Sequence, residues 1–289
     1  MTDLGAVAIV GAGQVGTMVG AALLEDGPSA RVTSVSLYDA DPQVAQAALA
    51  LGGGTMVLSD PLSVLQADVV VLAVPLTEIL AWLEEFGPRL RTGLALLDTG
   101  SAKAAVVAAM ARLVPPGVHA MGGHPMAGSE ESGPSAAVPG ALRDAPFVLS
   151  PCRTDPEALR IAIALVTACG ARPLVVEAVE HDRLVARTSH LPHLVASALA
   201  VVAAEIGDDL PLTRALVGSG FRSSTRLAAS DSRMVAAFAS ANRRQLEAAL
   251  REFRQQMETV ELALAAGPVP LEEALGRGRQ ARELVLGRP

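Results

Sequence analysis

The feature that most constrains the fold is a glycine-rich turn between an apolar segment and a helix near the N-terminus. The apolar residues 6–10 are followed by Gly11-Ala12-Gly13-Gln14-Val15-Gly16, and the pattern then predicts a helix to about Glu25. Gly11 permits a tight turn, Gly13 lets the backbone approach a pyrophosphate, and Gly16 lets the helix pack on its strand. The amides at the helix N-terminus favour a bound phosphate.

An acidic residue ends the second predicted strand, at residues 31–41. Asp39 at this place can accept hydrogen bonds from both ribose hydroxyls of NAD and would repel the extra phosphate of NADP. Asp41 competes for the role, and a glycine turn without a cofactor is the alternative interpretation. We predict a Rossmann-type domain that binds NAD. The predicted cofactor contacts are Gly11, Gly13, Gln14, Val15, Gly16, Asp39, Val74 and Pro75.

The alternation of strands and helices continues through the first half of the chain. The apolar run 67–76 stops near Pro75, where a doubly wound sheet has its ligand-binding edge. A strand at 171–178 is expected to close the sheet. Beyond it we expect one helix over 179–206, kinked at Pro192, and then a long amphipathic helix over 243–265. The fold class is α/β: a Rossmann-type NAD-binding domain (1–178) followed by an all-helical substrate and dimerisation domain (179–289).

Composition excludes several classes of function. Aromatic residues make up 2% of the chain and the net charge is −7, which disfavours nucleic-acid binding. The longest apolar run, 194–204, is too short to cross a membrane. Cys152 and Cys169 form neither a disulfide framework nor a metal motif, so we expect a cytoplasmic protein without a metal.

Two loops carry candidate chemical groups. The stretch "AMGGHPMAGSEESG" at 120–133 is unsuited to the interior of a helix or strand, so His124 is expected past a strand end, with glycines leaving room for a substrate. Histidine readily accepts a proton near neutral pH. Considered alone, Ser101 is expected to cap a helix and Lys103 to be an exposed lysine with an anionic neighbour.

Five segments together resemble the prephenate and arogenate dehydrogenase family of tyrosine biosynthesis. They are "VGAGQVG", "DTGSAK", "GGHPMAGSE", "EHDRLVARTSHLPH" and "GSGFRSSTRLAASDSRM". The resemblance implies NAD-dependent oxidative decarboxylation of a prephenate-like dianion by a homodimer. It also implies that His124 is the catalytic histidine that hydrogen-bonds the C4 hydroxyl. Ser101 matches the serine of the family that orients this contact. Glu130, His190, Arg226 and, more weakly, Lys103 are the substrate-binding candidates.

Departures from the family pattern leave the substrate side chain open. Ser223 stands where many members have aspartate, and Ser232 and Val235 replace proline and tryptophan. Prephenate, arogenate and an amino-substituted prephenate of an antibiotic pathway are the alternatives. A β-hydroxyacid dehydrogenase would need a lysine base, and residues 181–235 contain no lysine. The remaining alternative is a non-catalytic NAD-binding regulator. Such a protein would lack a catalytic base and a cation that binds a substrate carboxylate, whereas this sequence offers His124 and Arg226.

Three further histidines are interpreted without a role in the site. His181 is expected to be a neighbour of a helix cap and His193 a packed core histidine. His119 is expected within a strand and is assigned no role.

Overall fold

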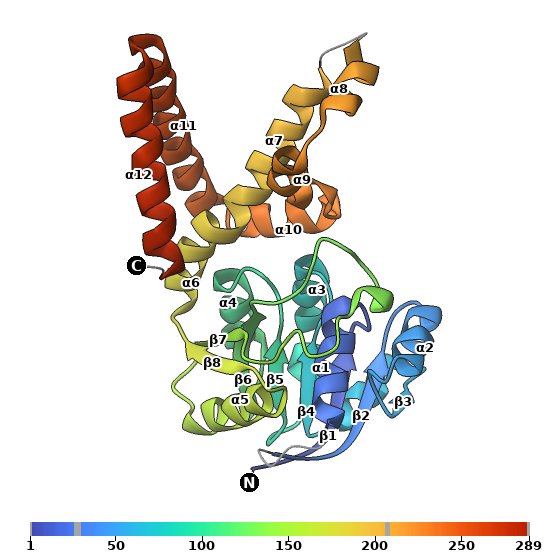
Figure 1. Cartoon of the computed structure of the whole chain (residues 1–289). Coiled ribbons are helices and arrows are strands. Elements are labelled where there is room, and N and C mark those ends of the chain that lie inside the picture. Colours follow the sequence, from blue (N-terminus) through green and yellow to red (C-terminus); the bar gives the residue numbers. More distant parts are fainter. Residues whose placement is uncertain (1, 26–29, 206–208, 288–289) are drawn as a thin grey trace. The chain divides into compact units, whose positions relative to one another are not determined.

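The computed structural model describes residues 2–25, 30–205 and 209–287 (Figure 1). Contacts divide the chain into two compact units, one up to Asn242 and one from Arg243 onward. We describe each unit by itself.

The first unit is built on an eight-stranded sheet with the order β3-β2-β1-β4-β5-β6-β7-β8. Neighbouring strands are parallel except β6 and β7, which are antiparallel. This confirms the predicted Rossmann-type fold, and β8 lies at the edge as expected. The strands are β1 (Thr2–Val10), β2 (Ala30–Tyr38), β3 (Met56–Val57), β4 (Val69–Leu72), β5 (Ala95–Asp98), β6 (His119–Pro125), β7 (Pro146–Pro151) and β8 (Arg172–Val175).

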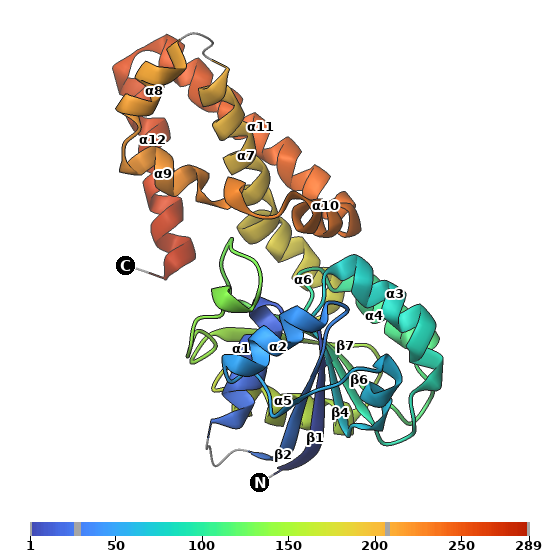
Figure 2. The same ribbon diagram turned by 90° about the vertical axis from the view of Figure 1, so that its right-hand side faces the viewer.

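Helices cover both faces of the sheet (Figure 2). One buried cluster joins the strands to α1 (Gln14–Leu24), α2 (Pro42–Ala50) and α5 (Pro156–Ala168). The other joins them to α3 (Leu76–Phe86) and α4 (Ala104–Leu113). Short 3₁₀ turns lie at η1 (Pro61–Gln66), η2 (Gly87–Arg89) and η3 (Pro134–Ala136).

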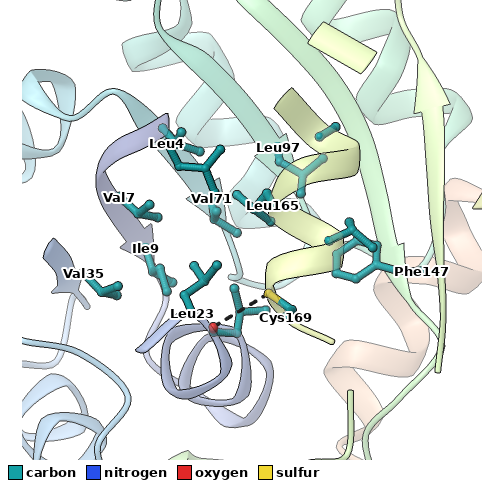
Figure 3. Packing of buried hydrophobic residues seen from close by; sticks show 14 of the residues in the cluster. Leu4, Val7, Ile9, Leu23, Val35, Val71, Leu97, Phe147, Leu165 and Cys169 are labelled. Carbon is teal, nitrogen blue, oxygen red and sulfur yellow. Dashed lines mark hydrogen bonds between the residues drawn. The ribbon is translucent and has the colours of Figure 1, made fainter. Parts of the chain in front are cut away.

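Small and branched side chains build the first of these clusters. Figure 3 shows Leu23 of α1 and Leu165 of α5 packed around strand residues that include Val7 and Ile9. Cys169 is a free, buried thiol whose Sγ lies 4.0 Å from the carbonyl oxygen of Val19. Apolar burial on both faces explains why the central strands β4 and β5 are nearly continuous apolar runs.

The rest of the first unit is helical, as predicted. The expected kinked helix is α6 (Ala178–Val185), a π-helical turn η4 (Ala186–His190) and α7 (Leu191–Ala204); its predicted end at 206 lies outside the described residues. Pro192 lies in the first turn of α7, so the π turn accommodates the residue that lacks an amide hydrogen. The chain continues through α8 (Leu210–Leu216), α9 (Ser219–Thr225), the 3₁₀ turn η6 (Arg226–Ala229) and α10 (Ser232–Ala241).

The second unit is a pair of helices, α11 (Arg243–Ala266) and α12 (Pro268–Leu286), packed against each other. Gly267 joins them with a φ of 116°, a left-handed value that favours glycine. The predicted amphipathic helix is confirmed as α11. None of the helices within the described residues is long and apolar enough to cross a membrane.

Candidate active site

The glycine-rich turn has the geometry that its sequence predicts. Gly11 has a φ of 96°, and a methyl group there would lie 2.6 Å from the carbonyl oxygen of Ala73. A methyl group at Gly16 would lie 1.9 Å from the carbonyl oxygen of Gly11, so only glycine lets α1 pack this closely. At Gly13, the residue that precedes α1, a methyl group would meet no atom within 4 Å. The turn is therefore closed toward the protein and open at the position expected to face a pyrophosphate.

The acidic residues after β2 have different partners. Asp41 caps α2, because its carboxylate accepts a hydrogen bond from the amide of Gln43 at 2.9 Å. Asp39 Oδ2 accepts from the amide of Ala12 at 2.8 Å, inside the glycine-rich turn. Asp39 contacts the glycine-rich turn whereas Asp41 caps α2, so Asp39 stays the predicted ribose-binding carboxylate.

The other predicted cofactor residues surround the same turn. Val74 lies against Gly11, and Pro75 precedes the first residue of α3. Val15 packs partly against the core and lies in the first turn of α1, where backbone amides have no partner within the helix. Gln14 uses its side chain elsewhere.

Gln14 ties the turn to the loop after β6. Its Nε2 donates to Ser129 Oγ at 2.6 Å and to the carbonyl oxygen of Ala136 at 2.9 Å, while its Oε1 accepts from the amide of Ser129 at 3.0 Å. The Gln14 amide lies in the first turn of α1, where backbone donors have no partner within the helix. A cofactor contact of Gln14 is therefore expected through its backbone.

The position of His124 differs from the sequence prediction. It lies inside β6 rather than past the strand end, because the antiparallel neighbour β7 extends the ladder and pairs His124 with Val148. The preceding glycines serve packing. A methyl group at Gly123 would lie 2.3 Å from the carbonyl oxygen of Asp98, and one at Gly122 would lie 2.8 Å from Val107. The expectation that these glycines make room for a substrate is wrong.

A buried ion pair organises the loops beside His124. The Asp98 carboxylate accepts from the amides of Gly100 at 2.8 Å and Gly123 at 2.9 Å, and it pairs with the ammonium group of Lys103. Neither charged side chain has any exposed surface. The expected exposed lysine is therefore wrong, and its anionic neighbour is Asp98. Burial lowers the pKa of Lys103, although Asp98 opposes that shift.

Ser101 does not cap the helix that follows it. The α4 helix begins at Ala104, and its first amides are satisfied by the Asp182 carboxylate from α6. Asp182 accepts from the amide of Lys103 at 2.7 Å and from the amide of Ala104 at 2.9 Å. The capping prediction is wrong because a carboxylate distant in sequence occupies the cap, and this leaves the Ser101 hydroxyl available for another role.

His181 is the site residue that the sequence interpretation missed. Its Nε2 lies 2.9 Å from His124 Nδ1, and its Nδ1 lies 2.8 Å from Asp182 Oδ1. The two imidazoles and the carboxylate are all buried. The available signal was the adjacent histidine and aspartate in "EHDRLVARTSHLPH", but nothing local shows that this pair faces β6.

His124 is held in its neutral form. Burial lowers its pKa well below the usual value of 6.5, and the neighbouring His181, Lys103 and His190 side chains act in the same direction. A neutral imidazole at this position can accept a proton at neutral pH.

His190 is buried beside the Ser101 loop. Its Nε2 lies 3.2 Å from the Ser101 carbonyl oxygen and its Nδ1 lies 3.2 Å from Asn242 Nδ2, while its ring stacks on Phe238. Burial, the largest cause, lowers the pKa of His190 to about 4. Its contact with a substrate stays a prediction. His193 also packs on Phe238, edge-on, as expected for a packed histidine.

Arg226 and Glu130, two of the predicted substrate ligands, form an ion pair. The Arg226 side chain is 55% exposed and that of Glu130 is 22% exposed. The backbone amide of Glu130 and then Arg226 lower the pKa of the Glu130 carboxyl. Ser223, the departure from the family pattern, donates to the carbonyl oxygen of Gly220 within α9 at 3.1 Å, and so leaves Glu130 as the carboxylate partner of Arg226.

The described part of the chain contains no cluster of side chains suited to bind a metal ion. No group of three or more histidine, cysteine, aspartate or glutamate side chains there could hold a metal ion.

Comparisons with known proteins identify the family. The model of the prephenate dehydrogenase nucleotide-binding domain matches residues 19–175, and that of the prephenate dehydrogenase dimerization domain matches residues 177–272. A cyclohexadienyl dehydrogenase of Zymomonas mobilis is 32% identical over 78% of this chain and 77% of its own length. A prephenate dehydrogenase of Bacillus subtilis is 30% identical over 76% of this chain, which spans 60% of that protein.

A solved structure shows the same similarity in three dimensions. The arogenate dehydrogenase of Synechocystis superposes with a TM-score of 0.78 and 26% identity, over 97% of this chain and 99% of its own. The family models together cover most of the sequence, in the order of the two parts of the fold. This chain belongs to the prephenate dehydrogenase family.

Proposed function

We propose that the protein catalyses the NAD-dependent oxidative decarboxylation of prephenate or arogenate. The observation that carries the proposal is His124, a buried and neutral imidazole near the carboxyl end of β6. That end lies on the same edge of the sheet as the glycine-rich turn after β1, because β1, β4, β5 and β6 are parallel neighbours. Ligands of open α/β sheets bind at this edge.

The residues after β1 and β2 fit a dinucleotide. Open space at Gly13 admits a pyrophosphate, and a carboxylate at Asp39 favours the unphosphorylated ribose of NAD. NAD, when bound, accepts the hydride that leaves C4 of the substrate.

Four residues of the chain have roles in this reaction. His124 accepts the proton of the C4 hydroxyl while the Ser101 hydroxyl orients that group. Arg226 binds a substrate carboxylate, since its planar guanidinium stays charged and can form two parallel hydrogen bonds. Glu130 holds Arg226 in place through their ion pair. Loss of carbon dioxide then leaves an aromatic ring, which makes the overall step effectively irreversible.

The substrate is prephenate or arogenate rather than the amino-substituted analogue. Two relatives matched over about three quarters of this chain are a cyclohexadienyl dehydrogenase and a prephenate dehydrogenase. Lys103 is buried and paired, so we assign it to the support of the site through Asp98 rather than to a substrate contact.

The assembly is proposed to be a homodimer formed by the helical part of the chain, residues 179–289. The match to the family's dimerization domain supports this assignment. Large apolar side chains exposed on the helices support it further; they include Val201, Val202, Leu212, Leu216, Leu262, Leu264, Leu275 and Leu284.

The experiment that tests the activity supplies purified protein with NAD and either prephenate or arogenate. Formation of NADH with release of carbon dioxide from at least one substrate is the expected result. A folded protein that binds NAD but turns over neither substrate would refute the proposed activity. The ratio of kcat/KM for the two substrates identifies the preferred side chain.

A further inference from the structure

We infer that Asp182 and His181 fix the tautomer of His124, with the proton on Nδ1 and the Nε2 lone pair free to accept a proton. Neither residue is among the ligands proposed above, and both act through His124 as positioning residues. The consequence for catalysis rests on the proposed function, while the tautomer itself can be measured without a substrate.

The chain of contacts begins at a fixed carboxylate. Asp182 accepts hydrogen bonds from the amides of Lys103 and Ala104 at the start of α4, and its own carbonyl oxygen accepts from Asn242 Nδ2 at 2.7 Å. Burial opposes ionisation of Asp182, but its hydrogen bonds with His181 and these amides keep the pKa of the carboxyl below its usual value. The carboxylate is therefore an acceptor at every contact.

An ionised carboxylate beside His181 determines where that imidazole carries its proton. Asp182 Oδ1 lies 2.8 Å from His181 Nδ1, so this nitrogen must be the donor. In the inferred arrangement the buried His181 is neutral, and a neutral imidazole has only one N–H group. His181 Nε2 therefore presents a lone pair toward β6.

The same reasoning then assigns the proton of His124. Its Nδ1 lies 2.9 Å from His181 Nε2, and one of the two nitrogens must donate. Because His181 Nε2 carries no proton, His124 Nδ1 donates and His124 Nε2 is left unprotonated. This is the form that a base for the C4 hydroxyl needs.

The arrangement also stabilises the product of proton transfer. When Nε2 receives the substrate proton, His124 becomes an imidazolium whose Nδ1–H stays bonded to His181. The negative charge of Asp182, one residue further along, offsets the new charge. No proton passes from His124 to His181 in this scheme, so one proton leaves the hydroxyl and one is gained at Nε2.

Long-range proton–nitrogen NMR spectra of the ligand-free protein at neutral pH test the tautomer directly. The imidazole signals of His124 are identified by their loss in His124→Asn. We expect wild-type protein to show protonated Nδ1 and unprotonated Nε2 at His124. A wild-type spectrum with the proton on Nε2 would overturn the inference, whatever substrate the enzyme uses.

The variant Asp182→Asn tests the effect on turnover. Asparagine carries no negative charge, so it no longer holds the proton on His181 Nδ1 as firmly, and it no longer offsets the positive charge that forms on His124. We expect kcat to fall roughly 10²–10⁴-fold, as for loss of one acid–base group, with the KM for NAD nearly unchanged. In His181→Gln, a side-chain carbonyl can replace Nε2 as the acceptor, so this variant should keep more activity than His181→Leu.

Asp155→Asn is the matched control. Asp155 also caps a helix through two amides, those of Glu157 and Ala158, and it also contacts a histidine, since its Oδ2 lies 2.9 Å from His119 Nδ1. This variant should lose stability without a change in kcat. Equal kcat in Asp182→Asn and Asp155→Asn would contradict the inference. Absence of turnover by the wild type would instead contradict the proposed function and leave the NMR result to decide the tautomer.

Discussion

The buried carboxylate of Asp98 joins three parts of the site, and no sequence motif predicts these contacts. Its carboxylate contacts Gly100 in the loop after β5, Gly123 in β6 and the ammonium group of Lys103. A buried charge with no partner is strongly unfavourable, so Lys103 and Asp98 depend on each other. The pair also places a positive charge near His124, where it helps to lower the pKa of the imidazole.

Replacing Lys103 with methionine should therefore destabilise the protein. Lys103→Met leaves Asp98 buried without its cation, and we expect the free energy of unfolding to fall by about 3–5 kcal/mol. Urea denaturation measures the change. Arg91→Met is the control, because its partner Asp68 and Arg91 itself are both about half exposed and such pairs contribute up to about 1 kcal/mol. Similar losses in the two variants would show that burial does not govern the Lys103 pair.

At the scale of elements, β6 and α7 show how neighbours decide what a segment does. The antiparallel strand β7 extends β6 through Pro125 and so brings His124 into the sheet. In contrast, α7 has few buried residues in the described chain, although it is strongly apolar. Its exposed side chains include Leu199, Val201 and Val202, and exposed apolar side chains in such number are typical of an interface.

A charge on this face should weaken the proposed dimer. Val202 is 67% exposed, and Val202→Glu would place a carboxylate where apolar contact is expected. We expect the dissociation constant to rise at least tenfold, equivalent to about 1.4 kcal/mol. Analytical ultracentrifugation over a range of concentrations measures it. Leu62→Glu, at an exposed apolar residue of η1, is the control and should leave the dimer intact. A monomeric wild type, or an unchanged dissociation constant in Val202→Glu, would contradict the assignment of this face.

At the scale of the whole molecule, local sequence patterns predict the strands, helices and glycine-rich turn that surround the site. The contacts between its side chains depend on tertiary structure. The conformations of Gly11 and Gly16 follow from strand, turn and helix signals that are adjacent in sequence. The contact between His124 and His181 joins residues 57 positions apart. The hydrogen bonds by which Asp182 caps α4 join residues 79 and 78 positions apart in sequence. No periodicity or turn preference encodes such pairs, and the sequence therefore predicts for Ser101 a cap that Asp182 supplies instead.

The most direct test of the central claim, that His124 is the base of an NAD-dependent dehydrogenase, is the kcat of His124→Asn with the preferred substrate. We predict a fall of roughly 10²–10⁴-fold, with the dissociation constant of NAD changed little, because the side chain takes the C4 proton but does not hold the dinucleotide. A kcat equal to that of the wild type would contradict the claim and place the base elsewhere.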